Sequence, residues 1–200
     1  MRDIAFFISW TCYGQWLHGD QRGSVDEIHN EFGLPLLSAD AERHQGERER
    51  MSQPPYDLDA PRRRLVLQSI RDVCAYRGWT LHAVHVRARH IHVVVSGNQT
   101  PDRMMNDLKS YAGRALNAAN LDGPQRKRWT RHGSTRHIDD EQHLAAAVHY
   151  VLYKQGEPME RWPETPLPDG RGSSTGSGET ETPLPDGRGS SSGSGPSQGE

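Results

Sequence analysis

The sequence contains very little cysteine: Cys12 and Cys74 are the only two in 200 residues. They lie far apart and form no Cys-x-x-Cys pair. This argues against a disulfide framework and a cysteine-ligated zinc site, so we expect two reduced thiols. Long apolar runs are also absent, and Met1–Trp10 lacks the apolar core of a signal peptide. These absences predict a cytoplasmic protein that does not engage a membrane.

A strong net charge is missing too, because 24 basic residues face 26 acidic ones, but the balance changes along the chain. Residues 157–200 hold three arginines and eight acidic residues, whereas all eleven histidines lie within 1–156. The first part is therefore mildly basic, which permits nucleic-acid binding without requiring it.

Apolar residues are scarce over 159–200, where Gly, Ser, Pro and Thr dominate and a stretch that begins at Glu164 recurs 17 residues later at Glu181. Such a segment cannot bury enough surface to offset the entropy lost on ordering. We therefore predict a folded domain over 1–158 and a disordered tail over 159–200.

Within the domain, the periodicities follow the order strand, helix, strand, strand, helix, strand, helix. This order predicts an α+β fold, a ferredoxin-like sandwich in which helices cover one face of an antiparallel sheet. We interpret the polar, glycine-containing stretch 14–60 as a long, mostly irregular insertion with a short charged helix within Ala39–Met51. We expect strands at Ile4–Tyr13, Trp79–Arg87, Arg89–Ser96 and Arg128–Ile138, and helices that start at Pro61, Thr100 and Asp139 or Asp140.

The tripeptide His90-Ile91-His92 belongs to a strand that continues into three valines. Side chains alternate between the faces of a strand, so His90 and His92 point the same way while Ile91 faces a core. Two neutral imidazoles one strand repeat apart can converge on one metal ion. The alternative interpretation is a pair of surface histidines on a half-buried strand.

The last helix carries Tyr150, which lies off the apolar stripe of that helix. Residues four apart share a helix face, so Tyr150 and Lys154 project together. A tyrosine in this place is free to meet a metal site on the sheet. The alternative is an amphipathic tyrosine at the edge of the core.

Four further stretches accompany these motifs: Trp10–Val25, Leu108–Leu116, Trp129–Arg136 and Tyr150–Gly156. Together with the layout of histidine strand, helix, strand and tyrosine helix, they resemble the single-tyrosine HUH transposases, named for histidine, hydrophobic residue, histidine. Within these, the chain is most similar to the REP-associated tyrosine transposases. The likeness covers roughly residues 4–158 and none of the tail.

The resemblance implies metal-dependent cleavage and rejoining of single-stranded DNA, as in DNA transposition or the mobilisation of REP elements. His90 and His92 would hold Mg²⁺ or Mn²⁺, and Tyr150 would attack the scissile phosphate, leaving a 5′-phosphotyrosine and a free 3′-OH. The partner would be single-stranded or hairpin DNA, bound by a monomer or a homodimer.

At the third metal ligand the chain departs from the family, which has Gln or Asn one turn after the tyrosine. Lys154 stands there, and a protonated lysine has no lone pair. Either Gln155 swings into the site, although an ideal helix places it about 140° from Tyr150, or Lys154 contacts the phosphate, or metal binds weakly. We favour Gln155.

Tyr111 is a rival nucleophile, although the resemblance gives its helix a role in contacting the DNA backbone. Four other histidines are expected to be hydrogen-bonded or DNA-facing rather than metal ligands: His82, His85, His132 and His137. The residues expected to contact DNA are Lys154, Lys109, Arg114, Arg87, Arg89, Arg131 and Arg136.

Two other functions stay open, a metal-dependent phosphodiesterase and a non-catalytic nucleic-acid-binding module on the same kind of sheet. Val93–Val95 occupy the positions where a metallo-β-lactamase-like motif needs further ligands, and Val93–Ser96 lacks the aromatic side chains of common RNA-binding sheets. A metal-dependent covalent adduct between DNA and protein would separate the transposase hypothesis from both.

Overall fold

A computed structural model describes residues 5–17, 19–20, 39–123 and 125–164. The predicted disorder from residue 165 on, and the predicted irregularity of 21–38, lie outside the described residues. The strands are β1 (Ala5–Thr11), β2 (Thr80–Val86), β3 (His90–Ser96), β4 (Ser134–Ile138) and β5 (Glu160–Trp162). The helices are α1 (Ala41–Glu49), α2 (Ala60–Arg77), α3 (Pro101–Ala118) and α4 (Glu141–Tyr153).

The strands form one sheet in the order β4-β1-β3-β2-β5, in which all neighbours are antiparallel. The connection through α2 links β1 to β2, and the connection through α3 links β3 to β4, each passing over one intervening strand. The order β4-β1-β3-β2 with two such crossovers is the ferredoxin-like topology, so the predicted α+β fold is confirmed. No helix in the described part of the chain is both long and apolar enough to cross a membrane.

Local sequence explains where the helices begin and end. The Asp59 carboxylate accepts a hydrogen bond from a first-turn N–H of α2, and Pro61 occupies that turn, where its missing N–H costs nothing. Gly78 ends α2 in the left-handed conformation, with φ +68°. Thr100 and Asp140 cap α3 and α4 as Asp59 caps α2. The predicted helix starts are therefore confirmed.

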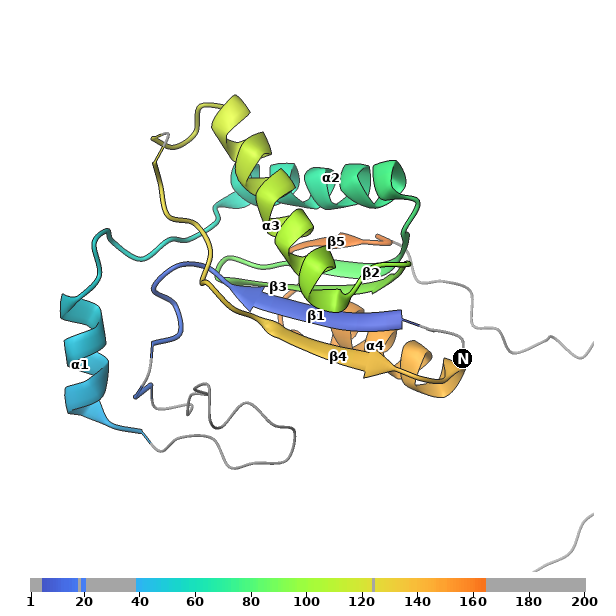
Figure 1. The fold of residues 1–200 in the computed structure, drawn as a ribbon, viewed down its shortest axis with the longest axis horizontal. Helices are drawn as coiled ribbons and strands as arrows, with labels where there is room; N and C mark the ends of the chain where they lie inside the picture. The colour runs from blue at the N-terminus through green and yellow to red at the C-terminus, as the bar shows by residue number, and fades with distance from the viewer. Residues whose placement is uncertain (1–4, 18, 21–38, 124, 165–200) are drawn as a thin grey trace, which may run out of the picture. The chain divides into compact units, whose positions relative to one another are not determined.

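The main core lies between the sheet and the pair α2 and α3, which cover one face together (Figure 1). Alternation along β1 directs Phe6, Ile8 and Trp10 to this face. Tyr56 and Leu58, at the end of the predicted insertion, are buried in the same core. The insertion thus contributes to the core as well as to the surface.

The prediction that all helices lie on one face of the sheet is wrong for α4, which covers the opposite face (Figure 1). There Val151 and Leu152 pack against Ala5, Ala83 and Val94. The inner strands carry apolar residues on both faces, as strands of a three-layer arrangement must, and the run of valines in β3 is typical of such strands. The position of α4 matters because it brings Tyr150 to the histidine face.

The predicted domain limit at residue 158 is also too early, because β5 follows it. Residues Glu160–Trp162 pair with β2, and the Trp162 ring packs against the main core. Glu160 forms an ion pair with Arg63 of α2 at 3.3 Å. A strand of three residues is too short to show a periodicity, and the Gly/Ser-rich sequence after it suggested that the tail had already begun.

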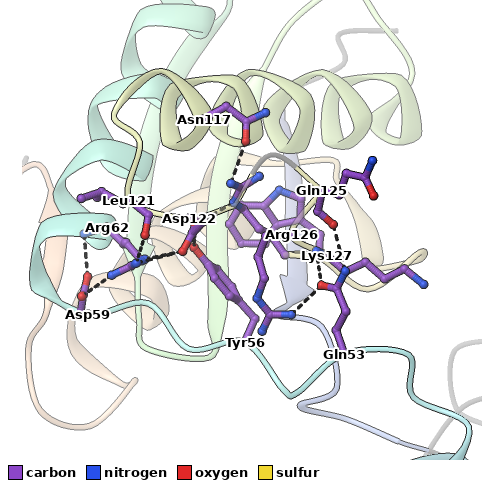
Figure 2. A network of polar contacts seen from close by, with 12 residues as sticks. Gln53, Tyr56, Asp59, Arg62, Asn117, Leu121, Asp122, Gln125, Arg126 and Lys127 are labelled. Carbon is purple, nitrogen blue, oxygen red and sulfur yellow. Dashed lines mark hydrogen bonds and ion pairs between the residues drawn. The ribbon is translucent and has the colours of Figure 1, made fainter.

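A polar network joins the start of α2 to the loop after α3 (Figure 2). Asp122 accepts hydrogen bonds from the Tyr56 hydroxyl at 2.6 Å, from Arg62 at 2.9 Å and from Arg128 at 3.0 Å. Arg128 also donates to Asn117 at 2.8 Å. Burial raises the pKa of Asp122, but these hydrogen bonds outweigh it and the net pKa is lowered. The network thereby fixes the loop that leads into β4.

Candidate metal and nucleophile site

His90 and His92 lie side by side on β3 and face α4, as the strand alternation predicts. Their ring centroids are 4.9 Å apart, with the rings at 73°. Thr11 and Ser9 of β1 lie opposite them in register, so the cross-strand neighbours of both rings are small side chains. The two imidazoles therefore share one location on the sheet.

Tyr150 projects from the last turns of α4 toward the same place. Its ring centroid lies 6.3 Å from that of His92, and 46% of the residue is exposed. The exposure leaves the tyrosine within reach of a large substrate. The structure thus brings Tyr150 to the His90–His92 pair of its own chain.

Phe7 of β1 is a site residue that the sequence analysis missed. Its ring stacks on His92 at 5.6 Å with an interplanar angle of 13°, and it meets the Tyr150 ring edge-on at 6.1 Å. Phe7 therefore orients both the candidate ligand and the candidate nucleophile. The alternation of β1 placed Phe7 on the α4 face, but only the pairing of β1 with β3 placed it beside His92.

His92 is held in its neutral form. Burial is the largest effect and, together with the nearby His90, His85 and Arg87, lowers its pKa to about 3, while the Gln155 amide acts in the opposite direction. A neutral imidazole keeps the lone pair that a metal needs. His92 is therefore ready to act as a ligand throughout the ordinary pH range.

Gln155 reaches the site because α4 ends before it. Tyr153 is the last helical residue, and Lys154 has left helical geometry with φ −108° and ψ 15°. The helical rotation that would carry Gln155 away from Tyr150 consequently does not apply. The Gln155 side chain raises the pKa of His92 through a hydrogen bond. Two other atoms of this pair, Gln155 Nε2 and His92 Nδ1, are buried and have no hydrogen-bond partner among the described residues.

Two buried polar atoms without partners at one place fit a site that is completed by a ligand. Rotation of the Gln155 amide exchanges its nitrogen and oxygen, so the group can present an oxygen there. Across the described ranges, no cluster of three or more His, Cys, Asp or Glu side chains is placed to hold a metal. A metal at His90 and His92 would need the Gln155 amide or water as further donors, and this mixed set suits Mn²⁺ better than Mg²⁺, which prefers oxygen alone.

Lys109 does not fit the expected contact with DNA. It is 7% exposed, and its ammonium donates to the carbonyls of Thr130 at 3.1 Å and His132 at 3.0 Å. A buried ammonium committed to carbonyls is not available to a phosphate, so the prediction for Lys109 is wrong. The side chain instead shapes the turn that presents Arg131.

Tyr111 lies on α3, across the sheet from the histidine pair, which removes it as a rival nucleophile. Its ring packs against the main core and lies under the Arg114 guanidinium at 4.1 Å. Arg114 is exposed on that same far side. A DNA contact of Arg114 would thus be remote from Tyr150.

The other predicted DNA contacts lie closer to the site. Arg136 of β4 pairs with Phe7 and so shares the α4 face, and Arg131 is exposed just before β4. Arg87 and Arg89 flank the turn before His90: Arg87 donates to the Glu157 carbonyl at 3.1 Å, and Arg89 forms an ion pair with Asp57 at 3.1 Å. Lys154 is exposed at the end of α4.

Of the four other histidines considered in the sequence, three have ring contacts to groups other than metal. His82 meets the Ser96 hydroxyl at 2.7 Å, and the His137 ring contacts Phe6 on the face away from α4. His132 is exposed, and its carbonyl accepts from Lys109. His85 is fully buried with both ring nitrogens hydrogen-bonded.

No protein-family model matches the chain, and no curated protein matches it. Among solved structures, it is similar to a REP-associated tyrosine transposase bound to a REP hairpin, with a TM-score of 0.42 and 11% identity over 77% of this chain and 67% of that chain. It is also similar to a candidate transposase from Deinococcus radiodurans R1, with a TM-score of 0.39 and 13% identity over 76% of this chain and 90% of that chain. Likenesses this low assign neither a residue nor a reaction to the chain.

Proposed function

We propose that this protein cleaves and rejoins single-stranded DNA through a covalent tyrosine intermediate, as a transposase does. The observation that supports the proposal is the convergence of Tyr150 with His90, His92 and Gln155 on one face of the sheet. Hairpin DNA is the substrate class to test first, because a structurally similar transposase is bound to a hairpin.

In this reaction the exposed Tyr150 hydroxyl attacks the scissile phosphorus. A bond forms between the phenol oxygen and phosphorus, and the bond to the 3′ oxygen breaks. The phenol loses its proton, the departing oxygen gains one, and the products are a 5′-phosphotyrosine and a free 3′-OH. The phosphotyrosine retains the ester, so a second 3′-OH can reverse the step and join a new DNA end.

His90, His92 and Gln155 would hold Mn²⁺ or Mg²⁺, which polarises the phosphate and stabilises charge on its oxygens when bound. The stacked Phe7 and the burial of His92 keep that imidazole oriented and neutral. The phosphates on either side would be bound by cationic side chains around the site, namely Arg87, Arg89, Arg131, Arg136 and Lys154.

The test incubates the protein with labelled single-stranded hairpins from the flanks of its own gene, with Mn²⁺, with Mg²⁺ or with EDTA, followed by a denaturing gel. We expect a metal-dependent covalent adduct that disappears in Tyr150→Phe and persists in Tyr153→Phe, the matched neighbour. The double change of His90 and His92 to Ala should abolish cleavage.

The other hypotheses have distinct outcomes in the same assay. Cleavage without an adduct would indicate a hydrolytic phosphodiesterase, and binding without cleavage a nucleic-acid-binding module. An adduct mapped by mass spectrometry to a residue other than Tyr150 would contradict the proposed nucleophile.

A further inference from the structure

The C-terminal end of α4 is tied to the sheet by two side chains that have no part in the proposed chemistry. The last carbonyls of a helix lack partners within the helix. Here His85 Nδ1 donates to the Val151 carbonyl at 3.1 Å, and Arg161 donates to the Leu152 carbonyl at 2.8 Å. Both carbonyls follow Tyr150 within two residues, so the contacts hold the part of the helix that carries the tyrosine.

These two side chains lie in one row with His92. His92 of β3 pairs with His85 of β2, and His85 pairs with Arg161 of β5. Residues directly opposite in an antiparallel sheet share a face, with Cβ atoms about 4.5–5.5 Å apart. The row therefore carries one candidate metal ligand and both anchors of α4, and the sheet itself sets the spacing between them.

His85 also contacts both ends of the segment 151–159, which contains Gln155. Its Nε2 accepts a hydrogen bond from the Met159 backbone N–H at 3.1 Å. A backbone N–H can only donate and a carbonyl can only accept, so the ring is neutral, with its proton on Nδ1. The imidazole is 1% exposed and bridges Val151 to Met159, the two ends of the segment.

The same segment is held between its ends. Arg87 donates to the Glu157 carbonyl at 3.1 Å, and Gly156 adopts φ +77°, a conformation that suits glycine. Gln155 thus sits in a short loop whose path is set by His85 of β2, by Arg161 of β5 and by Arg87 in the turn after β2. Helix periodicity plays no part in its position.

From these contacts we infer that His85 and Arg161 are positioning residues, which hold Gln155 and Tyr150 at the His90–His92 pair. The inference rests on the proposed function, because it assigns Gln155 to the metal. A metal ligand whose side chain is already ordered loses little conformational entropy when the metal binds. Removing a partner that orients a ligand typically weakens metal affinity about 10–100-fold.

The test is Mn²⁺ binding to the full chain, measured by isothermal titration calorimetry at a temperature where circular dichroism shows every variant folded. His85→Asn keeps a donor near Val151, His85→Gln keeps an acceptor near Met159, and Arg161 is changed to Met and to Lys. Asp122→Asn is the control, because it weakens a buried network away from the α4 face. Gln155→Ala reports on the ligand itself.

We expect both His85 variants and Arg161→Met to bind Mn²⁺ about 10–100-fold more weakly than the unchanged chain. Arg161→Lys should recover part of the loss, and Asp122→Asn should bind as the unchanged chain does. In the metal-free protein, the Met159 amide should exchange its hydrogen faster in the His85 variants.

Two results would overturn the positioning role while the proposed function stands. One is undiminished Mn²⁺ binding in the His85 and Arg161 variants beside weakened binding in Gln155→Ala. The other is an equal loss in Asp122→Asn, which would trace the effect to general stability. An unchanged chain that binds no Mn²⁺ would overturn the proposed metal site, and the inference with it.

Discussion

Asp122 gives the sharpest prediction about stability, because one carboxylate serves three donors. Its side chain is 8% exposed and that of Arg128 is 6% exposed, and their ion pair is 3.0 Å long. Asp122→Ala leaves the buried Arg128 guanidinium without its charged partner. Removing one member of a buried pair costs about 3–5 kcal/mol. For a chain of this size we expect the melting temperature to fall by roughly 6–20 °C.

The assay is urea unfolding followed by circular dichroism, with Asp102→Asn, an exposed first-turn aspartate of α3, as the control expected to cost less than about 1 kcal/mol. Adding Arg128→Met to Asp122→Ala should recover much of the loss, since no buried charge is then left unpaired. The pKa of Asp122 is lowered in the folded state, so its contribution is present above the unfolded pKa and is lost as the pH falls through the folded pKa. A loss below about 1 kcal/mol, or no recovery in the double variant, would refute this account of the network.

Three other predictions concern single features of the fold. Lys109→Met should destabilise the chain by roughly 3 kcal/mol, because three carbonyls lose a charged donor. Arg114→Met should change stability by less than about 0.5 kcal/mol, and equal effects of the two in urea unfolding would contradict the structural role of Lys109. Burial lowers the pKa of His85 from 6.5 to about 4, so only the unfolded chain gains a proton as the pH falls between these values. Stability should therefore drop by about 3 kcal/mol from pH 6.5 to 4, and the drop should shrink in His85→Gln if the assignment is right. A chain that ends after residue 164 keeps every described contact and should unfold as the full chain does. One that ends after residue 158 loses β5 and two hydrogen bonds to buried groups, so its free energy of unfolding should fall by roughly 2–6 kcal/mol. Equal stability of the two shortened chains would show that β5 contributes nothing.

Much of the fold could be predicted from the sequence because helix caps and strand alternation depend on neighbouring residues. The cap Thr100, the helix-starting Pro61 and the alternation around His90 and His92 act over a few residues, and each predicted its element. The element order then predicted the ferredoxin-like sheet, because few topologies satisfy such an order. The position of Tyr150 off its apolar stripe was equally visible.

The sequence by itself thus determined the elements before β5, the shared face of His90 and His92, and the outward position of Tyr150. Only the tertiary structure decided which face α4 covers, that Phe7 contacts both His92 and Tyr150, and that Lys109 is buried. It also decided the place of Gln155, because that loop follows the hydrogen bonds of His85 and Arg161 rather than a helical repeat. The physical reason is range: caps and periodicities act between neighbours in the chain, whereas register, layer and loop path depend on contacts between residues that are far apart in sequence.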